Sequence, residues 1–220
     1  MDDIDAMLDV AAAQLAELQA NYKKSLTSKD ITSAMRVQIK NIVENQRSAL
    51  EHYAYAATEA YGKAGARSYY PIAIADGDFL ALFNQQMPGV AANRPDIRDS
   101  VRLYQPYQNG YAWLAHLNTL SNENKHRRLS PQTKVEEQRR EVHGTGGSVS
   151  WTPGNVTFGG GVFINGEPVD PVTQRTASTI DVTYVDWLFT DVGVSVLGLL
   201  SEIQDKLPGA LTDLCKTANL

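Results

Sequence analysis

Two long apolar stripes dominate the first 61 residues. Apolar side chains recur at alternating spacings of four and three from Ile4 to Tyr22, and a second run with helical spacing extends from Met35 to Ala57. Such spacing places the apolar side chains on one face of a helix. The polar link SLTSKD between the two runs is short, and helices joined by a short link pack as antiparallel neighbours. The sequence therefore predicts an antiparallel helical bundle.

The pattern changes after Pro131, where short segments of alternating polarity replace the helical spacing. The segments SVSWT, NVTFGG, GVFI and EPVD are separated by turn-forming pairs, of which Asn165-Gly166 is the clearest hairpin signal. A longer strand, IDVTYVDWLF, follows them. These segments predict a small antiparallel β-meander, which is too small to bury much apolar surface alone and is expected to pack on the helices.

Helical spacing returns from Val196 to Leu214, where Pro208 is expected to kink or split the helix. The predicted class is α+β, with a helical bundle over residues 1–130, an antiparallel β region over residues 131–192, and a helix over residues 193–220 that returns to the bundle. Between the long helices and the β region, Tyr70-Pro71 forces an extended step, and PIAIA is either a short edge strand or a loop.

Composition narrows the classes of function. The formal net charge is -5, which argues against an open basic face for duplex nucleic acid but leaves room for a local basic cleft. Cys215 is the single cysteine, so no intramolecular disulfide and no cysteine zinc site can form. The chain begins with an acidic segment and contains no apolar run of about 20 residues. We expect a cytoplasmic protein with no membrane association, no metal and no cofactor.

The second helix carries an arginine and a histidine with four residues between them, in NQRSALEHYAYA. Arginine offers a charge-assisted fork to phosphate, and histidine exchanges protons near neutral pH. Five residues along a helix separate the two side chains by roughly 140°, so Arg47 and His52 would flank a groove. The alternative is structural, with Arg47 and Glu51 forming a pair at i,i+4 and His52 partly buried.

This arginine-histidine spacing resembles the motif of the HEPN (higher eukaryotes and prokaryotes nucleotide-binding) domains. The resemblance implies a HEPN-like bundle and a metal-independent ribonuclease or toxin of antiphage defence, acting on RNA as a homodimer. It assigns proton transfer to His52 and charge stabilisation to Arg47. Two features depart from the family pattern: Ser48 follows the arginine, and the motif lies within the second helix.

A second polar cluster, NENKHRRL, follows the aromatic segment YAWLAHLNTL. Its side chains suggest an anion site, in which His126 joins the acid-base chemistry and Asn124, Lys125 and Arg127, together with Glu51 from the second helix, bind the ligand. The alternative is a helix end, where cations interact favourably with the helix dipole.

The order RSALEHYA, YYPI, QPY, NENKHR resembles a widespread group of uncharacterised bacterial proteins. This resemblance spans residues 45–129 and implies that Arg47, Glu51, Asn124, Lys125 and His126 belong to one recurring pattern, without assigning them an activity. If residues 111–122 pack antiparallel on residues 31–61, the two clusters would form a cleft. The same groups could instead form a buried salt-bridge network that sets the helix register.

Three functions remain after the sequence is considered alone. The first is a HEPN-like ribonuclease whose substrate is RNA or a nucleotide. The second is a non-catalytic helical interaction module whose β region binds a protein partner. The third is a binding protein for a small anionic or nucleotide ligand.

Overall fold

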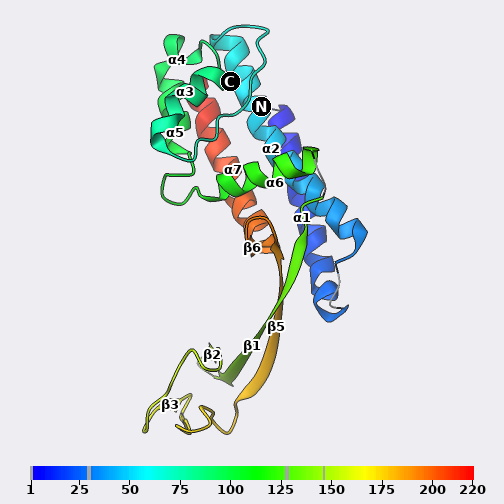
Figure 1. Ribbon diagram of the computed structural model, residues 1–220, viewed down its shortest axis with the longest axis vertical. Helices are drawn as coiled ribbons and strands as arrows, with labels where there is room; N and C mark the ends of the chain where they lie inside the picture. Colours follow the sequence, from blue (N-terminus) through cyan, green and yellow to red (C-terminus); the bar gives the residue numbers. More distant parts are fainter. Residues whose placement is uncertain (1, 29–30, 127–128, 146) are drawn as a thin grey trace. The chain divides into compact units, whose positions relative to one another are not determined.

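The protein is an α+β molecule in a computed structural model that describes residues 2–28, 31–126, 129–145 and 147–220 (Figure 1). The helices of this part of the chain are α1 (Asp2–Ser28), α2 (Ser33–Tyr61), α3 (Asp76–Gln86), α4 (Val90–Asn93), α5 (Pro95–Leu103), α6 (Trp113–His126) and α7 (Val196–Ala218). The strands are β1 (Gln132–Gly144), β2 (Gly147–Trp151), β3 (Phe163–Ile164), β4 (Glu167–Pro168), β5 (Ile180–Phe189) and β6 (Val194–Ser195). The prediction of an α+β fold, with an antiparallel sheet before the last helix, is confirmed.

The chain separates into two compact units. The helical unit contains the chain up to Thr133 together with Leu188–Leu220, and the β unit is Lys134–Trp187. The corresponding boundaries predicted from the sequence lie after residues 130 and 192. Each unit has apolar side chains of its own at its centre.

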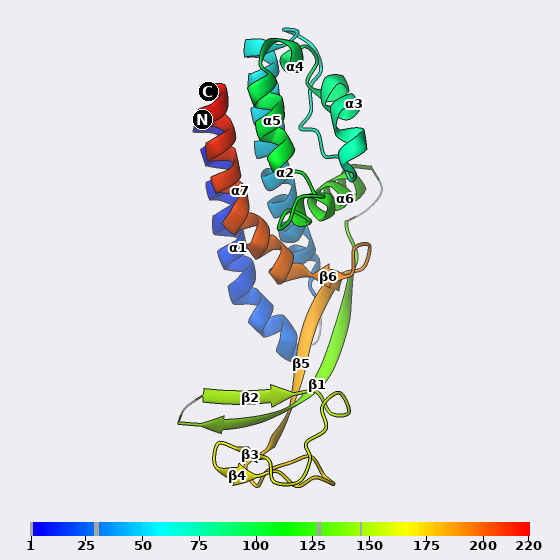
Figure 2. The same ribbon diagram turned by 90° about the vertical axis from the view of Figure 1, so that its left-hand side faces the viewer.

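Helices α1, α2 and α7 form the framework of the helical unit, and Figure 2 shows α1 and α7 side by side. The hydroxyl of Thr32 accepts the N–H of Met35 at 3.2 Å and caps the start of α2. The apolar stripe predicted for the first helix is buried, as its six members are at most 7 % exposed: Ile4, Leu8, Ala11, Leu15, Leu18 and Tyr22. Burial of this stripe against α2 and α7 stabilises the helical unit.

Helix α6 crosses α2 and does not pack antiparallel along it (Figure 1). The segment just before α6 is held at α7, because the Nζ atom of Lys206 donates to the carbonyl of Gly110 at 2.8 Å. From there α6 runs across the bundle to α2, and its apolar side chains are buried. The antiparallel packing that the sequence suggested for residues 111–122 is therefore wrong.

Helix α7 runs through Pro208 as one helix, so the proline does not split it. Figure 2 shows that its axis changes direction between the orange and the red part. Proline has no N–H to bond the carbonyl four residues earlier, and its ring crowds that carbonyl, so a bend is the expected result.

Substitution of Pro208 by alanine is expected to raise the free energy of unfolding by about 1–3 kcal/mol, because alanine restores the missing helical hydrogen bond. Urea unfolding followed by circular dichroism measures the change. Thr212→Ala is the control, since its hydroxyl only bonds the carbonyl of Pro208 at 2.9 Å. A destabilised Pro208→Ala protein would show that packing of the kinked helix outweighs the lost hydrogen bond.

The sheet has the strand order β2-β1-β5-β6. Strands β1 and β2 pair antiparallel, with Val142 opposite Val149 and Glu141 opposite Ser150. The predicted hairpin is confirmed, since β3 and β4 pair across Asn165 and Gly166, whose φ angles of 52° and 84° are those of a tight hairpin turn. The predicted strand IDVTYVDWLF is also confirmed, as β5.

Two features of the predicted meander are corrected. The segment NVTFGG forms no strand beyond a single bridge between Pro153 and Val156. Conversely, β1 is a thirteen-residue strand in a segment that showed no strand pattern. Only Glu141 and Val142 of β1 are buried, so most of this strand is exposed on both faces and its sequence carries no apolar alternation.

Candidate functional site

Arg47 and Glu51 form a close ion pair on α2. The Nη2 atom of Arg47 lies 2.5 Å from Oε1 of Glu51, and the two side chains are 9 % and 21 % exposed. The spacing i,i+4 brings them together on one face of the helix. This is the ion pair of the structural alternative that the sequence offered for this cluster.

Both side chains also bind the backbone of one residue, Tyr70. The guanidinium donates to the carbonyl of Tyr70 at 3.2 Å, and Oε2 of Glu51 accepts the N–H of Tyr70 at 2.7 Å. Residues 69–73 belong to no helix and have no strand partner among the described residues. The ion pair therefore takes the place of the neighbouring strand, because it satisfies backbone groups that are costly to bury alone.

The side chain of Gln105 binds backbone groups further along the same segment. Its Oε1 atom accepts the N–H of Ala73 at 2.8 Å, and its Nε2 atom donates to the carbonyls of Pro71 and Val101 at 3.0 and 3.1 Å. Gln105 is fully buried. The motifs RSALEHYA, YYPI and QPY thus meet in one hydrogen-bonded cluster, which we call the Tyr70 clamp: Arg47, Glu51, Tyr70, Pro71, Ala73 and Gln105.

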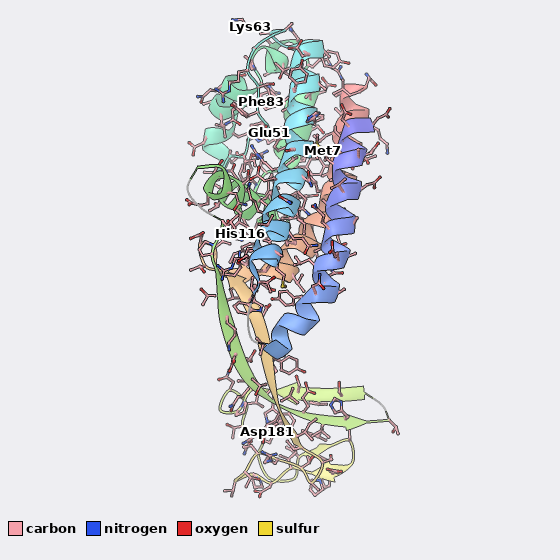
Figure 3. The ribbon with its side chains drawn as sticks, turned by 90° about the vertical axis from the view of Figure 1, so that its right-hand side faces the viewer. Met7, Glu51, Lys63, Phe83, His116 and Asp181 are labelled. Carbon is pink, nitrogen blue, oxygen red and sulfur yellow. The ribbon has the colours of Figure 1, made fainter. Side chains whose placement is uncertain are left out.

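Two tyrosine rings are buried at the clamp. Tyr70 is fully buried and packs 6.2 Å from the ring of Tyr53, centroid to centroid. Burial raises the pKa of both phenols above its ordinary value. Arg47 is buried, and Glu51 compensates its charge. Figure 3 marks Glu51 near the middle of α2.

The other residues predicted for a site are not brought into the clamp. His52 is exposed on α2. The amide oxygen of Asn124 accepts the N–H and the hydroxyl of Ser130 at 3.0 and 3.1 Å, so it fastens the end of α6 to the following turn. Among the described residues, no hydrogen bond or ion pair joins Asn124 to Arg47 or His52. The side chains of Lys125 and His126, and all of Arg127, lie outside the described part of the chain.

A polar network on the sheet of the β unit was missed by sequence reasoning. The Nε2 atom of His143 lies 3.1 Å from Oε2 of Glu141, and the hydroxyl of Tyr184 donates to the other carboxylate oxygen. The guanidinium of Arg139 lies 5.0 Å from the centre of the Tyr184 ring. The alternation of β1 places Arg139, Glu141 and His143 on one face, but that alternation is visible only once the segment is known to be a strand.

The hairpin of the β unit exposes apolar side chains. Phe163 is 63 % exposed and pairs with Pro168 across the hairpin, and Val172 in the next loop is 88 % exposed. The other face of the hairpin buries Ile164 against Val142 and Trp151, in a core of four buried side chains. We call Phe163, Pro168 and Val172 the hairpin surface.

Within the described ranges, no group of three or more histidine, cysteine, aspartate or glutamate side chains could hold a metal ion. None of the helices described is long and apolar enough to cross a membrane. Comparisons of the chain with protein-family models, curated proteins and solved structures find no significant match.

Proposed function

We propose that the protein is a non-catalytic interaction module whose β unit binds a protein partner. The observation that supports this proposal best is the hairpin surface, where Phe163 and Val172 are exposed on a unit with a small apolar core. Aromatic side chains, phenylalanine among them, are enriched at protein interfaces relative to the rest of the surface.

The geometry of the Tyr70 clamp also favours a non-catalytic role. Arg47 is buried, and its Nη2 atom binds both Glu51 and the carbonyl of Tyr70, so the side chain would have to move out of the clamp to meet a scissile phosphate at the surface. That movement would leave a half-buried carboxylate and a buried backbone carbonyl without their partner, which is costly. The HEPN-like bundle, the ribonuclease activity and the homodimer therefore stay predictions, and the proposed function requires none of them.

A photo-crosslinking amino acid at position 163 tests the proposal in cells that express the protein. We expect one protein to be crosslinked at position 163. In a separate pull-down with tagged protein that lacks the crosslinker, Phe163→Ser should reduce recovery of that protein about tenfold or more, as expected for an interface anchor. Leu103 is the matched control site, since it is 62 % exposed on the helical unit.

Equal crosslinking to the same proteins from positions 163 and 103 would reject the hairpin surface as the binding site. A separate assay addresses the ribonuclease. Metal-independent RNA cleavage by the purified protein, abolished by His52→Ala with the fold intact, would establish catalysis and overturn the proposed function.

A further inference from the structure

Strand β2 forms one edge of the sheet in the β unit. The strand order begins with β2, and β1 lies beside it on its inner side (Figure 2). Residues 147–150 are exposed, with Val149 at 41 %. The outer side of an edge strand carries backbone N–H and C=O groups that have no strand to pair with.

The hairpin register shows which backbone groups of β2 face outward. Gly144 pairs with Gly147 across a loop of two residues, and the residues that flank such a loop bond to each other through their backbones. Bonded and non-bonded pairs alternate along an antiparallel ladder. Val149 therefore bonds β1, whereas Ser148 and Ser150 direct their N–H and C=O groups away from it.

Sheet edges in natural proteins are protected by charged side chains, by proline, by a bulge or by being very short. Strand β2 has none of these features, because GSVSW contains no charge and no proline and pairs with β1 over five consecutive residues. The other described edges are protected. Strand β5 contains Asp181 and Asp186, β4 contains Glu167 and Pro168, and β3 and β6 have two residues each.

Strand β2 is complementary to itself when two copies pair antiparallel about Val149. Ser148 of one copy then lies opposite Ser150 of the other, so that each outward N–H meets an outward C=O. Val149 lies opposite its counterpart in a non-bonded pair, where side chains come closest and pairs of β-branched residues are favourable. Since β2 is neutral, no like charges meet across this contact.

We propose that two copies of the chain associate through β2, which joins their sheets into one continuous sheet. Strands of five residues bury less surface than a permanent dimer needs, so the dimer is reversible, with a Kd of about 10–1000 µM. The contact uses residues other than the hairpin surface and does not depend on the proposed partner.

Sedimentation velocity at protein concentrations up to about 1 mM measures the association, and we expect a concentration-dependent dimer. Ser150→Pro removes an outward donor but no bond to β1, and proline is tolerated in an edge strand at such a position. It should raise the Kd of the dimer about tenfold or more. Ser150→Thr keeps the donor and is the matched control, with a Kd close to that of the unaltered protein. Slow hydrogen exchange of the Val149 N–H would show that β2 still pairs with β1.

A disulfide test reports the register of the two strands. Val149→Cys places a thiol opposite its counterpart, within the range of a disulfide. Under mild oxidation it should form a covalent dimer about tenfold faster than Val156→Cys. Val156 is the matched position, because it is 40 % exposed in the same unit, and the natural Cys215 is buried.

A protein that stays monomeric at every concentration would overturn the proposal. A dimer in which both cysteine variants form disulfides at the same rate would place the contact on another surface and would overturn it as well. The two cysteine variants keep every backbone donor of β2, so their comparison decides the matter even if Ser150→Pro folds poorly.

Discussion

Arg47→Ala is expected to lower the free energy of unfolding by about 3 kcal/mol. The substitution removes a charge that compensates Glu51, and it leaves the carbonyl of the buried Tyr70 without its donor. Removal of one partner from a buried ion pair costs about 3–5 kcal/mol, and the partial exposure of Glu51 places the expected loss at the lower end. Urea unfolding followed by circular dichroism measures it.

Arg98→Ala is the matched control for this prediction. Arg98 lies 2.7 Å from Asp99, which is 61 % exposed, and exposed ion pairs contribute at most about 1 kcal/mol. If Arg47→Ala unfolds at the same urea concentration as the unaltered protein, the Tyr70 clamp is not a structural element. The prediction that Arg47 serves a ligand would then gain support.

The helical part of the fold could be predicted because its packing follows a period in the sequence. The stripe from Ile4 to Tyr22 is buried as expected, since every third or fourth side chain faces the neighbouring helices. The strand β1 could not be predicted in this way. Its side chains from Gln132 to Arg140 are partly or fully exposed on both faces, so burial imposed no alternation of polarity on them.

The motif residues could be found in the sequence, but their role could not. The order RSALEHYA, YYPI and QPY identifies groups that meet in the structure, yet a guanidinium that binds phosphate and one that binds a backbone carbonyl have the same sequence signature. The informative signal was Pro71, because a buried segment without a partner strand needs donors and acceptors from side chains. Arg47, Glu51 and Gln105 provide them.

A second large effect is expected for Gln105→Leu, which keeps the side-chain size but removes the amide. The substitution leaves the N–H of Ala73 and the carbonyl of Pro71 buried without their partner. Each such group costs about 1–3 kcal/mol, so the free energy of unfolding should fall by about 3 kcal/mol. Gln108→Leu is the control, because the side-chain amide of Gln108 bonds the carbonyl of Arg102 over a long and exposed contact of 3.4 Å.

Hydrogen exchange separates this local effect from a general loss of stability. The N–H of Ala73 is protected by Gln105 alone, since no backbone acceptor bonds it among the described residues. In Gln105→Leu it should exchange much faster than the N–H of Tyr70, which Glu51 still holds. Equal acceleration at both positions would mean that the clamp opens as one unit. The effects of Arg47→Ala and Gln105→Leu on the free energy of unfolding should then not add in a double variant.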